Sequence, residues 1–167
     1  GYYQGNGARK VATIASSQTQ RVAQPAPLTD AATGLIDAGN WSVTASSNVP
    51  ASATSGIYFA NVIREDTNGT SQVVFIVRDD DGRSDILLQT SDATWQAYNA
   101  WGGRSLYVSN IGGARAQKVS YNRPFATRSN TPLNRDFVFG PEFAMVRWLE
   151  RNGYDVSHTT GVDSDRR

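Results

Sequence analysis

The stretch SDILLQTSDATWQAYNAWGGRSLYVSN (residues 84–110), followed by AQKVSYNRPF (residues 116–125), decides how the chain is organised. An apolar run at 86–88 has the length and the polar borders that are typical of a buried strand. A second short strand is predicted at 118–121, and it ends before Pro124, which cannot donate to a strand ladder. A helix is predicted between the two strands.

Three large rings mark one face of that helix. Trp95, Tyr98 and Trp101 recur at spacings of three, and Ser91 or Asp92 can cap the first turn. A Gly-Gly pair then ends the helix. Large aromatic side chains are mostly packing residues, so the two tryptophans are interpreted as core.

Further side chains would gather where the two strands end. Open α/β sheets usually bind ligands at the carboxyl edge of parallel strands, and a parallel pairing would bring Tyr98, Tyr121 and Arg123 to that rim. A tyrosine can equally bury its ring in the core while its hydroxyl finds a partner. Both interpretations of the two tyrosines stay open at this point.

The composition excludes several classes of site. The chain has 167 residues, enough for one large domain or two small ones, and its net charge of +1 gives no reason to expect nucleic acid or a membrane as partner. Zero cysteine excludes disulfides and thiolate chemistry, and the single histidine, His158, excludes a His-rich zinc site. No signal segment is visible, so the compartment, cytoplasmic or secreted, is left open.

Residues 1–81 are predicted to form part of a β-sandwich. Short segments rich in β-branched and aromatic residues alternate with turn residues, and the expected strands are 10–15, 41–45, 56–63 and 71–77. Asn68-Gly69 suits the positive φ of a hairpin turn, whereas the Pro-containing segment 24–39 is expected to be a surface loop. The acidic run at 79–81, followed by Gly82, is interpreted as a solvated linker rather than a calcium site and marks the domain boundary.

Residues 82–167 are predicted to form part of an α/β domain with a parallel sheet. The clearest helix begins at Pro141 and ends before Gly153, with a broad apolar face. A strand at 154–160 follows it, so strands and helices alternate. Both halves contain fewer strands than such folds usually have, and we expect the chain to be an oligomer or part of a longer chain.

Four segments carry a resemblance to a known family: GYYQGNGARKVATI, SDILLQTSDATWQAYNAWGGRSLY, KVSYNRPF and GPEFAMVRWLERNGYDVSHTTGVD. In this order they resemble the large (β) subunit of N,N-dimethylformamidase and the family that shares its C-terminal region. The resemblance implies an incomplete immunoglobulin-like β-sandwich at 1–81 and an incomplete glutamine amidotransferase-like α/β domain at 82–167. It also implies hydrolysis of a small amide at a mononuclear iron ion held by two tyrosines and a glutamate.

By motif, the positions that correspond to the tyrosine ligands are Tyr98 of AYN and Tyr121 of SYNRP. Phenolate oxygen is a hard ligand that suits ferric iron, and the charge of the ion favours the ionised phenol. The family's glutamate belongs to a motif that is expected downstream of this sequence. Glu142 and Glu150 are instead expected to face solvent or to cap their helix, and His158 is expected to be a structural residue.

Two hypotheses from different classes follow. In the first, the chain is a fragment of an iron-dependent amidohydrolase that acts on a small amide and is inactive without the remaining ligand. In the second, it is a non-catalytic extracellular or structural protein that keeps the fold and assembles through its β-rich half. The presence of the third iron ligand in the full protein distinguishes them.

Overall fold

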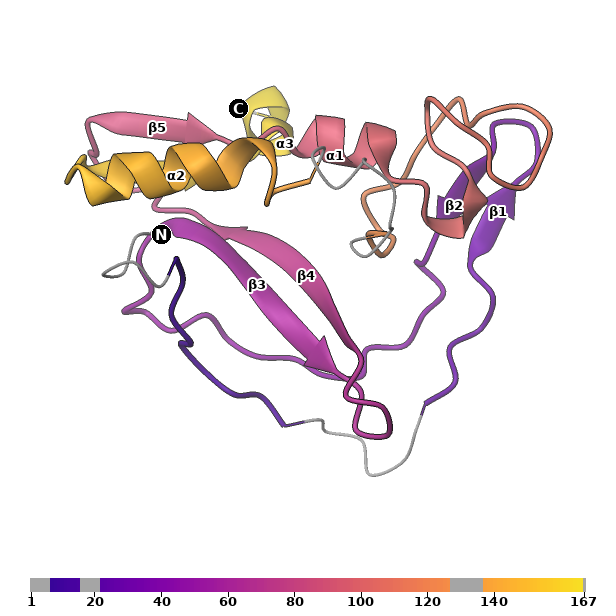
Figure 1. Cartoon of the computed structure of the whole chain (residues 1–167), viewed down its shortest axis with the longest axis horizontal. Coiled ribbons are helices and arrows are strands. Elements are labelled where there is room, and N and C mark those ends of the chain that lie inside the picture. The colour runs from indigo at the N-terminus through magenta and orange to yellow at the C-terminus, as the bar shows by residue number, and fades with distance from the viewer. Residues whose placement is uncertain (1–6, 16–21, 127–136, 167) are drawn as a thin grey trace.

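The computed structural model describes residues 7–15, 22–126 and 137–166. Its strands form three separate two-stranded sheets, so the described part is a mixed fold of short antiparallel and parallel sheets without a closed barrel (Figure 1). In chain order the elements are β1 (Leu28–Asp30), β2 (Leu35–Asp37), β3 (Gly56–Ile63), β4 (Thr70–Val77), β5 (Ile86–Gln89), α1 (Asp92–Tyr98), the 3-10 turn η2 (Trp101–Gly103), α2 (Pro141–Arg151), β6 (Val156–Thr159) and α3 (Gly161–Arg166).

The long hairpin β3–β4 confirms the two strands predicted at 56–63 and 71–77. The strands pair antiparallel from Gly56 opposite Val77 to Ile63 opposite Thr70. Asn68 in the connecting turn has a φ of 53°, in line with the turn chemistry of Asn68-Gly69. Because side chains alternate across a strand, one face of the hairpin turns toward the rest of the molecule and the other turns away from it.

The segment at 24–39 is not a loop throughout, because it contains the small hairpin β1–β2. Its strands have three residues each, too few to show the alternation by which strands are recognised. The turn between them is fixed by the Asp30 side chain, which accepts hydrogen bonds from the backbone N–H of Ala32 and the hydroxyl of Thr33. Gly34 supplies the left-handed conformation, with φ of 72°.

Two predicted strands of the first half are wrong: 10–15 and 41–45 are irregular. In the segment 41–45, polar groups near its start bond to residues 24 and 25 rather than to a neighbouring strand. The Gln24 amide bonds both the N–H and the C=O of Ser42, and the Trp41 indole donates to the carbonyl of Pro25. A segment rich in β-branched residues forms a strand only where another strand is available to pair with it. The sequence of the segment itself does not show whether such a partner exists.

The parallel pair β5–β6 confirms the strands predicted at 86–88 and 154–160, and with them a parallel pairing after Gly82. The predicted strand at 118–121 is wrong. That segment lies beside β2 instead, where Ser120 and Asn122 donate to the Asp37 carboxylate and the Ala38 N–H donates to the Asn122 carbonyl. Strand β6 therefore occupies the place next to β5.

The helix α2 begins at Pro141, as predicted, and lies above the β3–β4 hairpin in Figure 1. A cluster of buried residues, Trp95, Phe137 and Val138, packs against Ile57, Val74 and Phe125. This cluster draws on the hairpin and on the segments after Gly82 alike, and it confirms Trp95 as a core residue. Trp101 is half-buried and meets the ring of Trp41 edge-on. Within the described ranges, no helix has the length and apolar character needed to cross a membrane.

Candidate functional site

Asp92 joins the carboxyl ends of the two parallel strands. Thr90 comes directly after β5, and Gly161 is the second residue after β6. The Thr90 hydroxyl donates to Asp92 Oδ1 over 2.8 Å, and the Gly161 N–H donates to the same oxygen over 2.6 Å. Asp92 is 6% exposed, so the carboxylate is held almost out of water by these bonds. This edge of a parallel sheet is where α/β proteins usually bind ligands.

Tyr121 reaches the same carboxylate. Its hydroxyl donates to Asp92 Oδ2 over 2.9 Å, while its ring stays half in solvent, 49% exposed. The pKa of Tyr121 is raised above its ordinary value. Burial is the largest cause, and the hydrogen bond to Asp92 and the charge of Asp92 act in the same direction. Without a cation beside it, the phenol therefore keeps its proton at neutral pH.

Tyr98 lies at the other end of α1. It is the last residue of the helix, half-buried, and its ring stacks on Tyr107 with centroids 4.2 Å apart. Asp92 is the first residue, so the backbone positions of Asp92 and Tyr98 are about 9 Å apart along the helix axis. The joint role of Tyr98 and Tyr121 as ligands stays a prediction.

Glu142 does not face solvent, which corrects that part of the expectation. It is 6% exposed and turns toward the first turn of α1, where it accepts from the Ser91 N–H over 2.8 Å, from the Ser91 hydroxyl, and from the Trp95 indole over 3.0 Å. The reason is that packing α2 against α1 buries these donors, and buried donors require an acceptor. Glu142 thus satisfies donors at the start of α1 rather than in its own helix, and Ser91 makes no side-chain capping bond. Glu150 is half-buried.

Arg123 is also not at the rim. It is 6% exposed, and its guanidinium donates to four backbone carbonyls at 2.8–3.2 Å: those of Gln96, Asn99, Trp101 and Arg104. Burial lowers the pKa of Arg123 from its ordinary value. Since the last carbonyls of a helix have no partner inside it, Arg123 closes the end of α1 and is a structural residue.

His158 is 2% exposed, and neither ring nitrogen finds a hydrogen-bond partner among the described residues. Burial lowers the pKa of His158, and the charge of Glu150 opposes that shift in part. The imidazole is therefore neutral at pH 7. A buried strand position without a polar partner agrees with the structural role expected for this residue.

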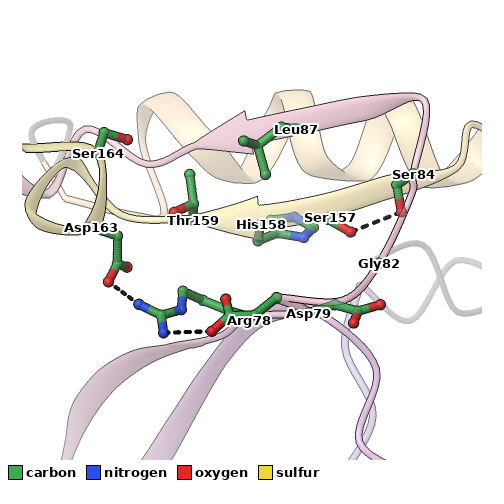
Figure 2. A pocket seen from close by; sticks show the side chains of 11 residues that line it. Arg78, Asp79, Gly82, Ser84, Leu87, Ser157, His158, Thr159, Asp163 and Ser164 are labelled. Carbon is green, nitrogen blue, oxygen red and sulfur yellow. Dashed lines mark hydrogen bonds and ion pairs between the residues drawn. The ribbon is translucent and has the colours of Figure 1, made fainter. Parts of the chain in front are cut away.

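A pocket of about 420 Å³ lies beside β6 (Figure 2). Arg78 forms one wall and is bound to the carboxylates of Asp163 and Asp80. Ser84 and Ser157 share a hydrogen bond of 2.8 Å. Most of the lining residues have polar side chains, and the guanidinium of Arg78 is already paired with acids, so the pocket presents no unbalanced positive charge to an anionic ligand.

The donor set at Asp92 and Tyr121 suits a hard cation. Ferric iron prefers oxygen ligands such as carboxylate and phenolate, and a carboxylate and a phenol that could ionise on metal binding meet at one point of the structure. Across the described ranges, no group of three or more histidine, cysteine, aspartate or glutamate side chains could hold a metal ion.

A family model described as N,N-dimethylformamidase beta subunit-like, C-terminal, matches residues 1–167. The chain belongs to this family. A search of curated proteins finds no significant match.

Membership in the N,N-dimethylformamidase beta subunit-like family confirms the resemblance carried by the four sequence segments and indicates a hydrolase-related chain. The sequence suggests Asp92 only as a possible helix cap and does not reveal its contacts with Thr90, Tyr121 and Gly161. The available signal is an acidic residue four positions after the end of the strand predicted at 86–88, since a ligand at the carboxyl edge of a sheet follows the end of a strand.

Proposed function

We propose that this chain is part of an iron-dependent amidohydrolase that acts on a small amide, with Tyr98 and Tyr121 as ligands of a mononuclear iron ion. Family membership supports the reaction class. The observation that carries the proposal is the Tyr121 hydroxyl on the buried Asp92, at the carboxyl ends of β5 and β6. As part of the same proposal, residues 1–81 belong to an immunoglobulin-like β-sandwich and residues 82–167 to an amidotransferase-like domain.

The chain's own residues prepare such a site in two ways. Asp92 orients the phenol of Tyr121, and the Tyr98–Tyr107 stack restricts the ring of Tyr98. An iron ion held there would supply Lewis-acid polarisation of an amide carbonyl. The half-exposed face of Tyr121 leaves room for a small amide to approach from solvent.

Iron binding tests the proposal. The full-length protein that contains this chain, with the downstream glutamate, is loaded with ferric iron, and iron content and the visible phenolate-to-iron absorption are measured for the wild type and for Tyr121→Phe. We expect Tyr121→Phe to lose the absorption band and most of the iron, because the ring keeps its packing but the ligand oxygen is gone. Tyr154→Phe is the matched control, since Tyr154 is 48% exposed and Tyr121 is 49% exposed.

The reaction itself is tested by the release of amine from N-alkylated formamides by the iron-loaded protein. The role of Tyr121 would be contradicted if the wild type bound iron without the absorption band. It would also be contradicted if the wild type and Tyr121→Phe bound iron equally well. Amine release that is the same with and without iron would contradict the metal dependence.

A second candidate function is a non-catalytic protein that assembles through its β-rich half. The outward face of the β3–β4 hairpin favours it: Val62, Val73 and Phe75 are 53%, 56% and 41% exposed, and neither strand contains a charged residue. Edge strands of soluble proteins are usually protected by charge or proline. Sedimentation velocity over a range of concentrations would show association that Val73→Lys abolishes, whereas an iron-free monomer at all concentrations would contradict both candidates.

A further inference from the structure

The two oxygens of the Asp92 carboxylate have different surroundings. Oδ1 is fixed by the Thr90 hydroxyl and the Gly161 N–H, and a side chain at Gly161 would crowd this oxygen at 3.3 Å. Oδ2 points the other way, and its partner within the described part of the chain is the Tyr121 hydroxyl. One oxygen is thus anchored and the other is presented beside the phenol.

The spacing of these oxygens is that of an ordinary hydrogen bond and is also compatible with a shared metal ion. Tyr121 Oη and Asp92 Oδ2 are 2.9 Å apart. Adjacent ligand oxygens of an octahedral ion with bonds of about 2.0–2.1 Å are also about 2.9 Å apart. An ion could therefore bind both oxygens by displacing the proton between them, with little movement of either side chain.

The charges lead to the same conclusion. If Tyr121 binds iron as a phenolate, its oxygen and Asp92 Oδ2 become two anionic oxygens at hydrogen-bond distance. Two like charges at this distance repel each other, and a cation between them would offset that repulsion. Hydrogen bonds to the outer oxygen of a ligating carboxylate, such as those of Thr90 and Gly161 here, are the usual support for a metal ligand.

We propose that Asp92 supplies a carboxylate oxygen to the same metal ion as Tyr121. The inference rests on the proposed function for the identity of the ion, which is ferric iron. It adds an aspartate of this chain to the tyrosine and glutamate ligands that the family resemblance implies. The phenol proton leaves to solvent when the ion binds, so the site exchanges one proton for one metal–oxygen bond.

The test compares two buried carboxylates at the start of α1. Asp92 and Glu142 are both 6% exposed, and only Asp92, of these two, bonds Tyr121. Asp92→Asn keeps an oxygen for Thr90 and Gly161 but puts an amide beside Tyr121. We expect Asp92→Asn to weaken ferric iron binding at least about tenfold and to shift or remove the absorption band, while Glu142→Gln retains both.

The outcomes separate the two proposals. If the wild type binds iron with the band, Tyr121→Phe loses it and Asp92→Asn keeps it, Asp92 is not a ligand and the proposed function stands. If Glu142→Gln loses iron while Asp92→Asn retains it, the carboxylate is Glu142 and the inference is overturned. If the wild type binds no iron, both proposals fail.

A measurement on the wild type covers the case in which Asp92→Asn does not fold. Aspartate is labelled with carbon-13 and the infrared difference spectrum is recorded on addition of ferric iron. We expect a shift of a labelled carboxylate stretch that is absent in Tyr121→Phe. Iron binding with the band and without such a shift would overturn the role of Asp92.

Discussion

At the scale of single residues, the buried guanidinium of Arg123 has an unusual set of partners. It is bound to four backbone carbonyls rather than to a carboxylate. Carbonyl dipoles at the end of a helix carry partial negative charge, so they can stabilise a cation without a formal anion. Arg123 thereby connects α1, η2 and the segment that carries Tyr121.

We expect Arg123→Met to lower the free energy of unfolding by about 2–4 kcal/mol, because it leaves buried carbonyls without donors. Arg123→Lys should recover part of this loss, since an ammonium can donate to some of them. Urea denaturation measures both variants. Arg115→Met is the control: its guanidinium bonds a single carbonyl, that of Leu106, at an exposed place, and a loss comparable to that of Arg123→Met would contradict the assignment.

The neutral imidazole of His158 makes stability depend on pH. Its pKa in the folded chain lies below the ordinary value of about 6.5, so between the two values the unfolded chain binds more protons. The free energy of unfolding is therefore highest, as far as His158 is concerned, above about pH 6.5. It decreases as the pH falls below that value, by at most about 1.4 kcal/mol per pH unit. Urea denaturation from pH 7.5 to 5 should show a steeper loss for the wild type than for His158→Leu; parallel curves would refute this.

The motif SYNRP singles out Tyr121 in the sequence, and its role as a metal ligand stays a prediction. The positions of other charged residues near Asp92 were not predictable. Glu142 and Arg123 carry charges that usually face solvent, and their burial depends on which backbone donors and acceptors the fold leaves unpaired nearby. Such pairing is a property of the folded arrangement and is not visible in local sequence.

At the scale of elements, local pattern was sufficient where the partner strand is close in sequence. Alternation and an Asn-Gly turn define β3–β4, and Pro141 with the apolar positions after it defines α2. The strand predicted at 118–121 is wrong, because this segment and β6 are both short candidates for a place beside β5 and only β6 pairs with it. The choice between them depends on long-range packing that the sequence does not encode locally.

The contact between η2 and β2 gives a prediction at this scale. Gly102 has a φ of 80°, and a Cβ there would meet Ile36 Cδ1 at 2.6 Å; Gly112 has a φ of 78° with open space around it. We expect Gly112→Ala to lower the free energy of unfolding by about 1–2 kcal/mol because of backbone strain. Gly102→Ala should lower it by about 1–3 kcal/mol more because of the clash with Ile36. Equal losses in urea denaturation would show that η2 does not pack against β2 in solution.

At the scale of the whole molecule, one aromatic cluster connects the two predicted halves. Phe137 packs on Trp95 and Phe125, and the cluster is covered by Ile57 and Val74 of the hairpin. A core shared in this way couples the stability of both parts. The boundary predicted at 79–82 therefore describes a change in secondary structure, and its status as a domain boundary stays a prediction.

We expect a single calorimetric unfolding transition that Phe137→Ala lowers as a whole, with a loss of about 3–5 kcal/mol. Phe137 is 8% exposed, whereas the neighbouring Phe139 is 45% exposed, so Phe139→Ala should cost clearly less. Two separate transitions, with only one of them moved by Phe137→Ala, would show that the halves unfold independently.

The parallel pairing of β5 with β6 also governs the order in which the chain can fold. Paired residues of the hairpin are 7 to 21 positions apart, from Ile63 with Thr70 to Gly56 with Val77, whereas Ile86 and Val156 are 70 positions apart. Closing the longer loop costs about 2 kcal/mol more chain entropy than closing the shortest, and hairpins form in about 1–10 μs. In pulsed hydrogen exchange, hairpin amides should gain protection before those of β5, and the Gly161 amide that holds Asp92 should be among the last protected.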